Sequence, residues 1–293
     1  MTLLVGFAPG RADRSGLELA AALARSIDTD LLVVTVVPAS WPTPVAGHTD
    51  REFEAWATER GEEGVAEAKE LLAEHYPDIA AEATWVSGRS VPTALLEECE
   101  KREASMLVLG SGHDGNYGHV NLSTTADRLL HSAHLPVALA TRGYRTDGQG
   151  TLSRATCAFR GDEVSRSTLH RTAEICHEVG AGLRIVTFAV RGRNMYPPET
   201  GTQNEDMVLD AWVSQAEKMQ HEAMAELDPG LSVETAVATA PSWGDVIGRL
   251  EWRRDEVLVI GSSSSASLLS RIFLGSSASK ILRHSPVPVI VVP

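Results

Sequence analysis

Small and hydroxyl-bearing residues gather at two places near the C-terminal end of the chain. Residues 261–267 read Gly-Ser-Ser-Ser-Ser-Ala-Ser, and Gly275 and Ser276 stand at the start of a segment with a helical pattern. Small side chains let backbone N–H groups approach an anion, and a helix N-terminus adds roughly half a positive charge. These residues fit a phosphate cradle in which Ser262 and Ser264 supply hydroxyl donors. The alternative is a serine-rich flexible loop with an ordinary serine cap.

A second small-residue loop lies in the first half of the chain. Residues 110–115 read Gly-Ser-Gly-His-Asp-Gly, which has the G-x-G-x-x-G spacing of a dinucleotide-binding turn. That fingerprint belongs to the first strand-to-helix turn and needs an acidic residue about 20 positions later. Here it follows a fourth apolar run, and residues 135–137 are Leu-Pro-Val. We therefore interpret it as a tight turn or as a loop that an anion can approach.

No combination of nucleophile, base and acid for covalent catalysis is recognisable in either half. Neighbouring carboxylates such as Glu97 and Glu98 fall on helical patterns, where we expect them to face solvent. His131 and His134 are spaced for one helix end rather than for a metal site, which needs a converging carboxylate. We expect the cysteines to be small buried hydrophobic residues: Cys99, Cys157 and Cys176. The sequence thus predicts no catalytic residues, no metal and no enzyme activity.

The elements that must position these loops occur twice. Three apolar segments recur in the same order at an offset of about 152 residues, which is far longer than the unit of a solenoid. The matching pairs are 31–37 with 183–189, 106–111 with 257–262, and 135–137 with 287–289. The chain is therefore a duplicated domain. We expect one domain at 1–143, a polar and glycine-rich linker at 144–152, and a second domain at 153–293.

Each half alternates short apolar runs with helical patterns. In the first half the runs are 2–7, 31–37, 82–86, 106–110 and 136–140. Most are apolar on both faces, as strands covered on both sides are. The sequence predicts an α/β fold with two tandem, doubly wound, parallel sheets of five strands each. Ligands of such sheets bind at the carboxyl ends of the strands, where the loops described above lie.

Composition limits the class of protein. The 293 residues are 43% hydrophobic and 22% charged, and the formal net charge is −13. An acidic chain has no basic field for sequence-independent binding to nucleic acid or to an anionic membrane. No apolar run reaches the roughly 20 residues of a membrane helix, and no signal peptide is recognisable. With three cysteines and no C-x-x-C pair, we expect a cytoplasmic protein.

The end of each half carries motifs in a fixed order. In the second half they are Gly261, Gly275 with Ser276, and the terminal segment 288–291, Pro-Val-Ile-Val. In the universal stress protein family the fourth strand is followed by G-x-x-G, nine residues and G-S/T, and then by a helix and a terminal P-V strand. Both halves resemble that domain, and the chain resembles the tandem form of the family. The resemblance implies an adenine nucleotide alpha hydrolase-like fold and a binding role in the stress response.

The resemblance also implies a site for ATP or another adenine nucleotide. In the family the glycines and the hydroxyl hold phosphates, while the ends of the first two strands hold the adenosine. In the second half the implied residues are Gly261, Ser262, Ser264, Gly275, Ser276, Arg160 and Phe188. Their equivalents in the first half are Gly110, His113, Ser123, Thr124, Val36 and Ala8.

Both halves depart from the family at the end of the first strand. The expected Asp is Ala8 in one half and Arg160 in the other. Losing a charge-assisted hydrogen bond costs about 1.5–3 kcal/mol. Arg160 could attract an anion in the cleft or form a surface salt bridge. We expect a degenerate nucleotide site in the C-terminal domain, with two alternatives: a protein-interaction module without nucleotide, and a weak ATP hydrolase.

The last strand of each half has an exposed edge. We expect residues 136–140 and 288–292 to offer backbone groups that a second copy could pair with, because open sheet edges are sticky unless covered. In the family these strands commonly mediate dimer contacts. The sequence thus predicts a homodimer through the terminal strands, with the two halves packed as a pseudo-dimer. A further protein partner is expected but not identifiable.

Overall fold

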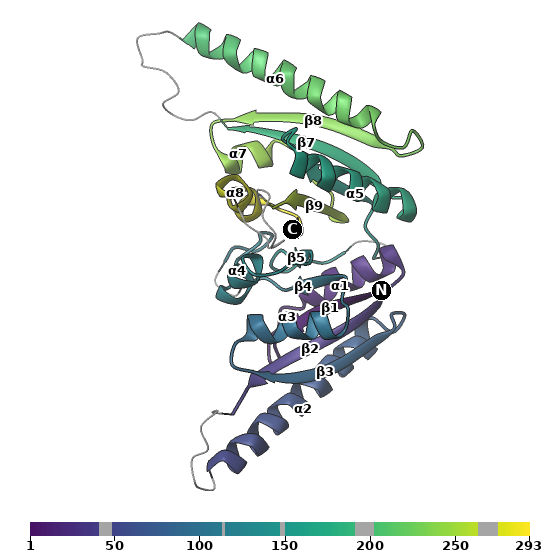
Figure 1. The fold of residues 1–293 in the computed structure, drawn as a ribbon, viewed down its shortest axis with the longest axis vertical. Coiled ribbons are helices and arrows are strands. Elements are labelled where there is room, and N and C mark those ends of the chain that lie inside the picture. The colour runs from purple at the N-terminus through teal and green to yellow at the C-terminus, as the bar shows by residue number, and fades with distance from the viewer. Residues whose placement is uncertain (41–48, 113–114, 147–149, 191–201, 263–274) are drawn as a thin grey trace.

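The computed structural model describes the whole chain except residues 41–48, 113–114, 147–149, 191–201 and 263–274 (Figure 1). The elements of the first half are β1 (Thr2–Phe7), α1 (Ser15–Ile27), β2 (Asp30–Pro38), α2 (Thr49–His75), β3 (Ala81–Gly88), α3 (Val91–Lys101), β4 (Met106–Leu109), α4 (Thr124–Leu130) and β5 (Val137–Leu139). The second half contains β6 (Arg154–Ala158), α5 (Glu163–Val179), β7 (Gly182–Val190), α6 (Thr202–Ala225), β8 (Val233–Ala240), α7 (Trp243–Gly248), β9 (Glu256–Gly261), α8 (Ser276–His284) and β10 (Val289–Val292). The repeated α/β order confirms the predicted fold class.

The strands form one sheet with the order β3-β2-β1-β4-β5-β10-β9-β6-β7-β8. Within each half all neighbouring strands are parallel, and the strand order reverses beside β1 and beside β6. The two five-stranded sheets meet where β5 pairs antiparallel with β10, with Ala138 opposite Ile290. The predicted parallel sheets are therefore present, and they are joined edge to edge.

This joint corrects the prediction of a homodimer through the terminal strands. β5 lies between β4 and β10, and β10 lies between β5 and β9, so both strands have neighbours on both sides. The pairing of these edges with a second copy is wrong, because the partner for each edge is the other half of the same chain. A homodimer as such stays a prediction. The sequence could not distinguish these cases, since either pairing satisfies the same backbone groups.

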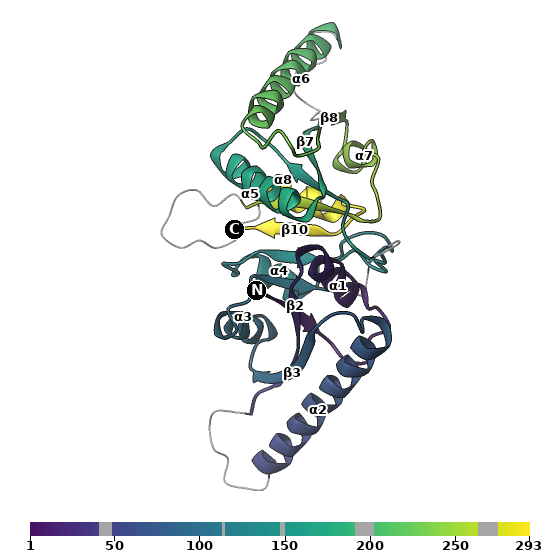
Figure 2. The ribbon, with the colours of Figure 1, turned by 90° about the vertical axis from the view of Figure 1, so that its right-hand side faces the viewer.

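Two apolar clusters cover the two faces of the sheet, and each extends through both halves. Leu3 and Val5 of β1 belong to the cluster under α1, α2, α5 and α6. Leu4, between them, belongs to the cluster under α3, α4, α7 and α8. Alternate side chains of a strand point to opposite faces, so a strand apolar at every position needs this double cover. Figure 2 shows the joined halves stacked lengthwise, with α2 and α6 at the far ends.

The amino ends of the strands differ between the halves. In the second half Glu256 is fully buried and pairs with two buried arginines, 2.7 Å from Arg154 Nη2 and 2.8 Å from Arg184 Nη2. Thr156 donates a further hydrogen bond to the Glu256 carboxylate. At the offset of the repeat, the first half has Thr2, Leu32 and Ser105 in place of the three charged residues. One amino end is thus ionic, and the other carries no charge at these positions.

The segment between the halves is held against α1. Thr146 donates to Glu18 Oε1 from its backbone nitrogen at 3.1 Å and from its hydroxyl at 2.8 Å. Tyr76 donates to Glu18 Oε2 at 2.7 Å. Burial opposes ionisation of Glu18, but these hydrogen bonds outweigh it, and the pKa of Glu18 lies below its usual value.

Candidate functional site

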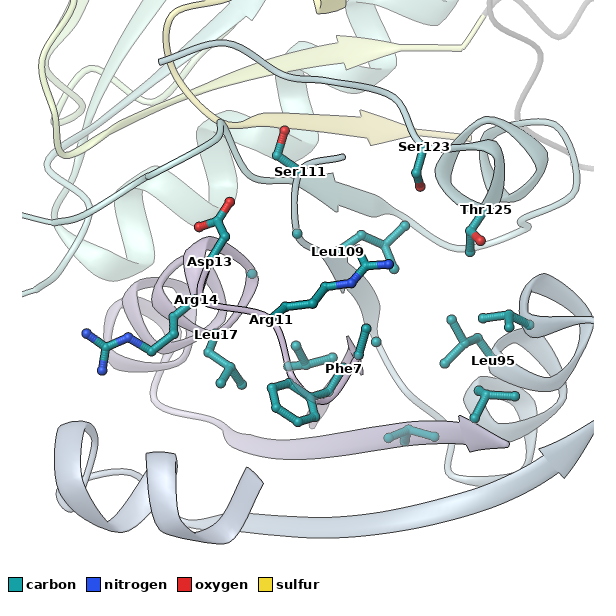
Figure 3. Close-up of a pocket in the computed structure, with 18 residues that line it drawn as sticks. Phe7, Arg11, Asp13, Arg14, Leu17, Leu95, Leu109, Ser111, Ser123 and Thr125 are labelled. Atoms are coloured by element: carbon teal, nitrogen blue, oxygen red, sulfur yellow. The ribbon is translucent and has the colours of Figure 1, made fainter. Parts of the chain in front are cut away.

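A cleft of about 220 Å³ lies at the carboxyl ends of β1, β2 and β4 in the N-terminal half (Figure 3). This is where the strand order reverses, and the chain leaves neighbouring strands in opposite directions there. Most of its lining is apolar because the cleft is an extension of the sheet core, with Phe7, Val34, Leu95 and Leu109 among its residues. The arrangement offers a flat apolar group a place next to backbone at the strand ends.

The closest backbone contact of this cleft involves two glycines. A Cβ atom on Gly16 would lie 2.8 Å from the backbone nitrogen of Gly110, which is closer than a real Cβ contact allows. The start of α1 therefore packs directly on the end of β4. In the second half the equivalent of Gly16 is Thr168, which is buried beside Gly261.

Charged side chains lie on one side of the N-terminal cleft. Arg11, Asp13 and Arg14 all line it, and they belong to the loop between β1 and α1. Asp13 accepts hydrogen bonds from the Ser15 backbone nitrogen at 3.0 Å and from the Ser15 hydroxyl at 3.2 Å. Among the described residues neither arginine side chain forms an ion pair. In Figure 3 the Arg11 side chain extends toward Leu109, whereas Arg14 points outward.

A larger cavity of about 660 Å³ adjoins this cleft and shares Arg11 and Ser123 with it. Its other lining residues include Gly112 and Thr124 from the first half, and Arg283 of α8 from the second. The cavity therefore lies between the two halves. A ligand with its apolar part in the cleft can extend past Arg11 into this space.

The loop between the cleft and the larger cavity is fixed by its own hydrogen bonds. Asn121 donates its backbone N–H to the Ser111 hydroxyl at 3.0 Å, and its carbonyl accepts from Gly112 at 2.8 Å. Ser123 caps α4 by accepting from the Ala126 nitrogen at 3.1 Å. A hydroxyl that accepts in this way still has its own proton to donate. Ser111 and Ser123 therefore remain donors beside the cleft.

The C-terminal cleft is smaller, at about 100 Å³. Its lining includes Trp243 and Phe188. At the repeat offset of 152, these residues correspond to Val91 and Val36, which line the N-terminal cleft. Both aromatic side chains are larger than the valines at the equivalent positions. The sequence analysis did not identify Trp243 as a cleft residue. The repeat offset of 152, which aligns Trp243 with Val91, is the signal that could have found it.

Arg160 forms a salt bridge at the rim of the C-terminal cleft. Its Nη2 lies 2.5 Å from Asp162 Oδ2. Asp162 caps α5 and accepts from the Ser165 nitrogen at 2.9 Å. Partial burial would raise the pKa of Asp162, but the hydrogen bonds from Ser165 and the Arg160 charge lower it below the usual value. Of the two interpretations of Arg160, the geometry fits the salt bridge.

The structure brings together only part of the predicted site. In the N-terminal half, Ala8, Val36, Gly110 and Ser123 line the cleft, and Thr124 lines the larger cavity. In the C-terminal half the cleft is lined by Arg160, Phe188 and Gly261.

The remaining predicted residues lie elsewhere. Gly275 is the N-cap of α8 and Ser276 its first residue, but neither lines the cleft. Ser262 is fully buried, and its hydroxyl has no hydrogen-bond partner among the described residues. Ser264 and His113 lie outside the described residues.

The cysteines are poor nucleophiles in this structure. All three are buried and free of disulfides. Burial raises the pKa of Cys99 and Cys157 to about 12 and that of Cys176 to about 11, so their thiols stay protonated at neutral pH. In the described part of the chain, no group of His, Cys, Asp and Glu is arranged to hold a metal ion. None of its helices could span a membrane.

Comparison with known proteins places this chain in one family. A sequence model of the universal stress protein family matches residues 1–141 and again 152–293. The chain belongs to this family and has its tandem form.

Full-length relatives are known from mycobacteria. Universal stress protein Rv2319c of Mycobacterium tuberculosis and universal stress protein Mb2346c of Mycobacterium bovis are each 37% identical over 295 residues, covering all of both chains. The similarity therefore spans both halves of this chain.

Solved structures show the same fold. A universal stress protein from Archaeoglobus fulgidus matches with a TM-score of 0.63 and 16% identity, over 99% of this chain and 97% of the other. A putative universal stress protein from Pseudomonas aeruginosa matches with a TM-score of 0.55 and 15% identity, over 99% and 92%. At such identities the likeness concerns the fold alone.

Proposed function

We propose that this universal stress protein acts in the stress response by binding an adenine nucleotide, and that the N-terminal cleft is its main site. One observation carries the proposal: an apolar cleft at the strand ends continues past Arg11 into a second cavity. The cleft suits a base and ribose, and the donors beyond it suit phosphates. Small-molecule sites are typically apolar pockets with a few polar groups at one end.

The C-terminal cleft is the second candidate. It keeps Gly261, and the motif residues Gly275 and Ser276 follow in the chain, which is why the sequence favours it. Its volume of about 100 Å³ and the side chains of Trp243 and Phe188 argue for weaker binding. We therefore rank it below the N-terminal cleft.

Binding without turnover is part of the proposal. Hydrolysis of ATP needs an activated water and a metal held by acidic groups. Asp13 is the carboxylate that lines the N-terminal cleft, and it is engaged by Ser15. We propose a cytoplasmic location, since the three thiols are free.

The proposal is tested by placing a tryptophan in the N-terminal cleft. Val91 lines the cleft and is 41% exposed, so Val91→Trp can be accommodated without repacking the core. The indole takes space from the ligand, and calorimetric titration with ATP should show affinity reduced about tenfold or more, which is about 1.4 kcal/mol. The matched control is Ile175→Trp, because Ile175 on α5 is 42% exposed and lies outside both clefts.

Three results contradict the proposal. Equal ATP affinity in Val91→Trp and the wild type would move the site out of the N-terminal cleft. Steady release of ADP or AMP from ATP with Mg²⁺ would replace the binding role with the hydrolase alternative. A wild type that binds no nucleotide would favour the protein-interaction alternative.

A further inference from the structure

Two arginines from different halves line the cavity between the halves. Arg11 follows β1 in the N-terminal half, and Arg283 lies in the last turn of α8 in the C-terminal half. They are 272 positions apart in sequence and share this space because β5 and β10 join the two sheets. The cavity of about 660 Å³ is large enough for several phosphate groups.

Arg11 and Arg283 are both exposed, and no described residue neutralises either guanidinium. Within the described part of the chain, Arg11 and Arg283 have no ion pair and no side-chain hydrogen bond. The described lining of the cavity includes no Asp or Glu. Two cations facing one space repel each other, and an anion between them turns that repulsion into attraction. With respect to the described residues, both cations therefore remain available to an anion from outside, in a chain whose net charge is −13.

Hydrogen-bond donors line the same cavity as the two arginines. Ser123 and Thr124 line the cavity, and the Ser123 hydroxyl accepts from Ala126, which leaves its proton to donate. The hydrogen bonds of Asn121 to Ser111 and Gly112 hold the neighbouring loop in place. Donors fixed in advance bind an anion at a lower entropic cost than mobile ones do.

The residues equivalent to Arg11 and Arg283 under the repeat are not a second pair of arginines. At the offset of 152, Arg11 corresponds to Glu163, and Arg283 corresponds to His131. The C-terminal half thus has a carboxylate where the N-terminal half has Arg11. The paired cations are a property of one site and not of the duplicated fold.

We propose that the cavity between the halves binds the phosphate groups of the ligand, with Arg283 of the C-terminal half completing the N-terminal site. The inference rests on the proposed function, in which the base occupies the N-terminal cleft and the phosphates extend past Arg11. Guanidinium groups hold phosphates through paired charge-assisted hydrogen bonds. The C-terminal half therefore contributes directly to a ligand site of the N-terminal half.

The test compares Arg283→Gln with Lys280→Gln in the full chain. Lys280 lies one turn earlier on α8, is exposed and lines none of the cavities described above, so both variants remove one positive charge from the same helix. Calorimetric titrations use ATP and, separately, inorganic tripolyphosphate. Arg283→Gln and Arg11→Gln should each weaken both ligands about tenfold, and Lys280→Gln should change either by less than about twofold.

The outcomes separate this inference from the proposed function. If the wild type binds ATP and Arg283→Gln behaves like Lys280→Gln, the inference is overturned and the nucleotide site stands. If tripolyphosphate binding depends on Arg283 but ATP binds no more tightly than tripolyphosphate, the inference stands and the base site falls. If the wild type binds neither compound, both are overturned.

Discussion

The N-terminal and C-terminal halves have the same order of strands and helices, but they carry different side chains at the two ends of their strands. At the carboxyl end, the first half leaves a cleft of about 220 Å³, whereas the second leaves one of about 100 Å³ that is lined by Trp243 and Phe188. At the amino end, the second half buries Glu256 between two arginines, whereas the first half has uncharged residues at those positions. The comparison teaches that the two halves share one architecture, whereas substitutions give them different cleft linings and different amino ends.

The largest effect should come from the ionic end of the C-terminal half. Glu256→Gln leaves the buried Arg184 without its counter-charge and leaves Arg154 with only the exposed Glu234, and breaking a buried pair in this way costs about 3–5 kcal/mol. The free energy of unfolding in urea measures it. The matched change in the other half is Ser105→Ala, which removes one hydrogen bond to the Thr2 carbonyl and should cost about 1 kcal/mol. Equal costs would show that the two amino ends do not differ energetically.

A smaller effect should follow from opening the C-terminal cleft. Trp243→Val gives this half the residue that the N-terminal cleft has, so ATP titration should reveal a second, weaker binding site. Losing a half-buried indole should also cost about 1–2 kcal/mol of stability. Trp252→Val is the control, because Trp252 lines neither cleft. Its ring centroid lies 4.8 Å from the Cζ atom of Arg184. A second site in both variants, or in neither, would break the comparison of the clefts.

The smallest effect should come from an equivalent pair on α1 and α5. Glu18 is held by Tyr76 and Thr146, whereas its counterpart His170 pairs with Glu226 at 3.1 Å on the surface. Glu18→Gln should cost about 1 kcal/mol at pH 7, and His170→Gln less than about 0.5 kcal/mol.

The pH dependence sharpens this third prediction. The pKa of Glu18 is lower in the folded protein than its usual 4.5, so its ionised form stabilises the fold above that pH. The contribution is lost as the pH falls through the lowered pKa. Urea unfolding curves of the wild type and Glu18→Gln should therefore differ at pH 7 and converge in acid. A difference that persists below that pKa would contradict this assignment.

The sequence predicted the repeated fold because the relevant signals are local. Runs such as 31–37 are apolar on both faces, and a strand of that kind needs helices on both sides. Val36 and Gly110 could be placed in a cleft for a similar reason, since residues at the ends of parallel strands meet at one edge. These features depend on neighbours in sequence or on the regular sheet.

The rest depends on contacts that sequence spacing does not reveal. Arg283 reaches the N-terminal site only through the pairing of β5 with β10, and that pairing looks the same in sequence as pairing with a second copy. The volume of the C-terminal cleft depends on where the Trp243 ring lies. The sequence does not decide whether Arg160 binds an anion or forms a salt bridge, because its partner, Asp162, is also suited to cap a helix. In the structure Asp162 both caps α5 and pairs with Arg160.

The antiparallel contact of β5 with β10 has a consequence for how such a protein can change. In an assembly of two identical chains, every substitution is present on both sides of the contact, so an arginine at the position of Arg283 would occur in both copies. Covalent fusion removes that constraint. Arginine at 283 and histidine at 131 can coexist in a fixed one-to-one ratio, and one half can lose its own pocket while assisting the pocket of its neighbour.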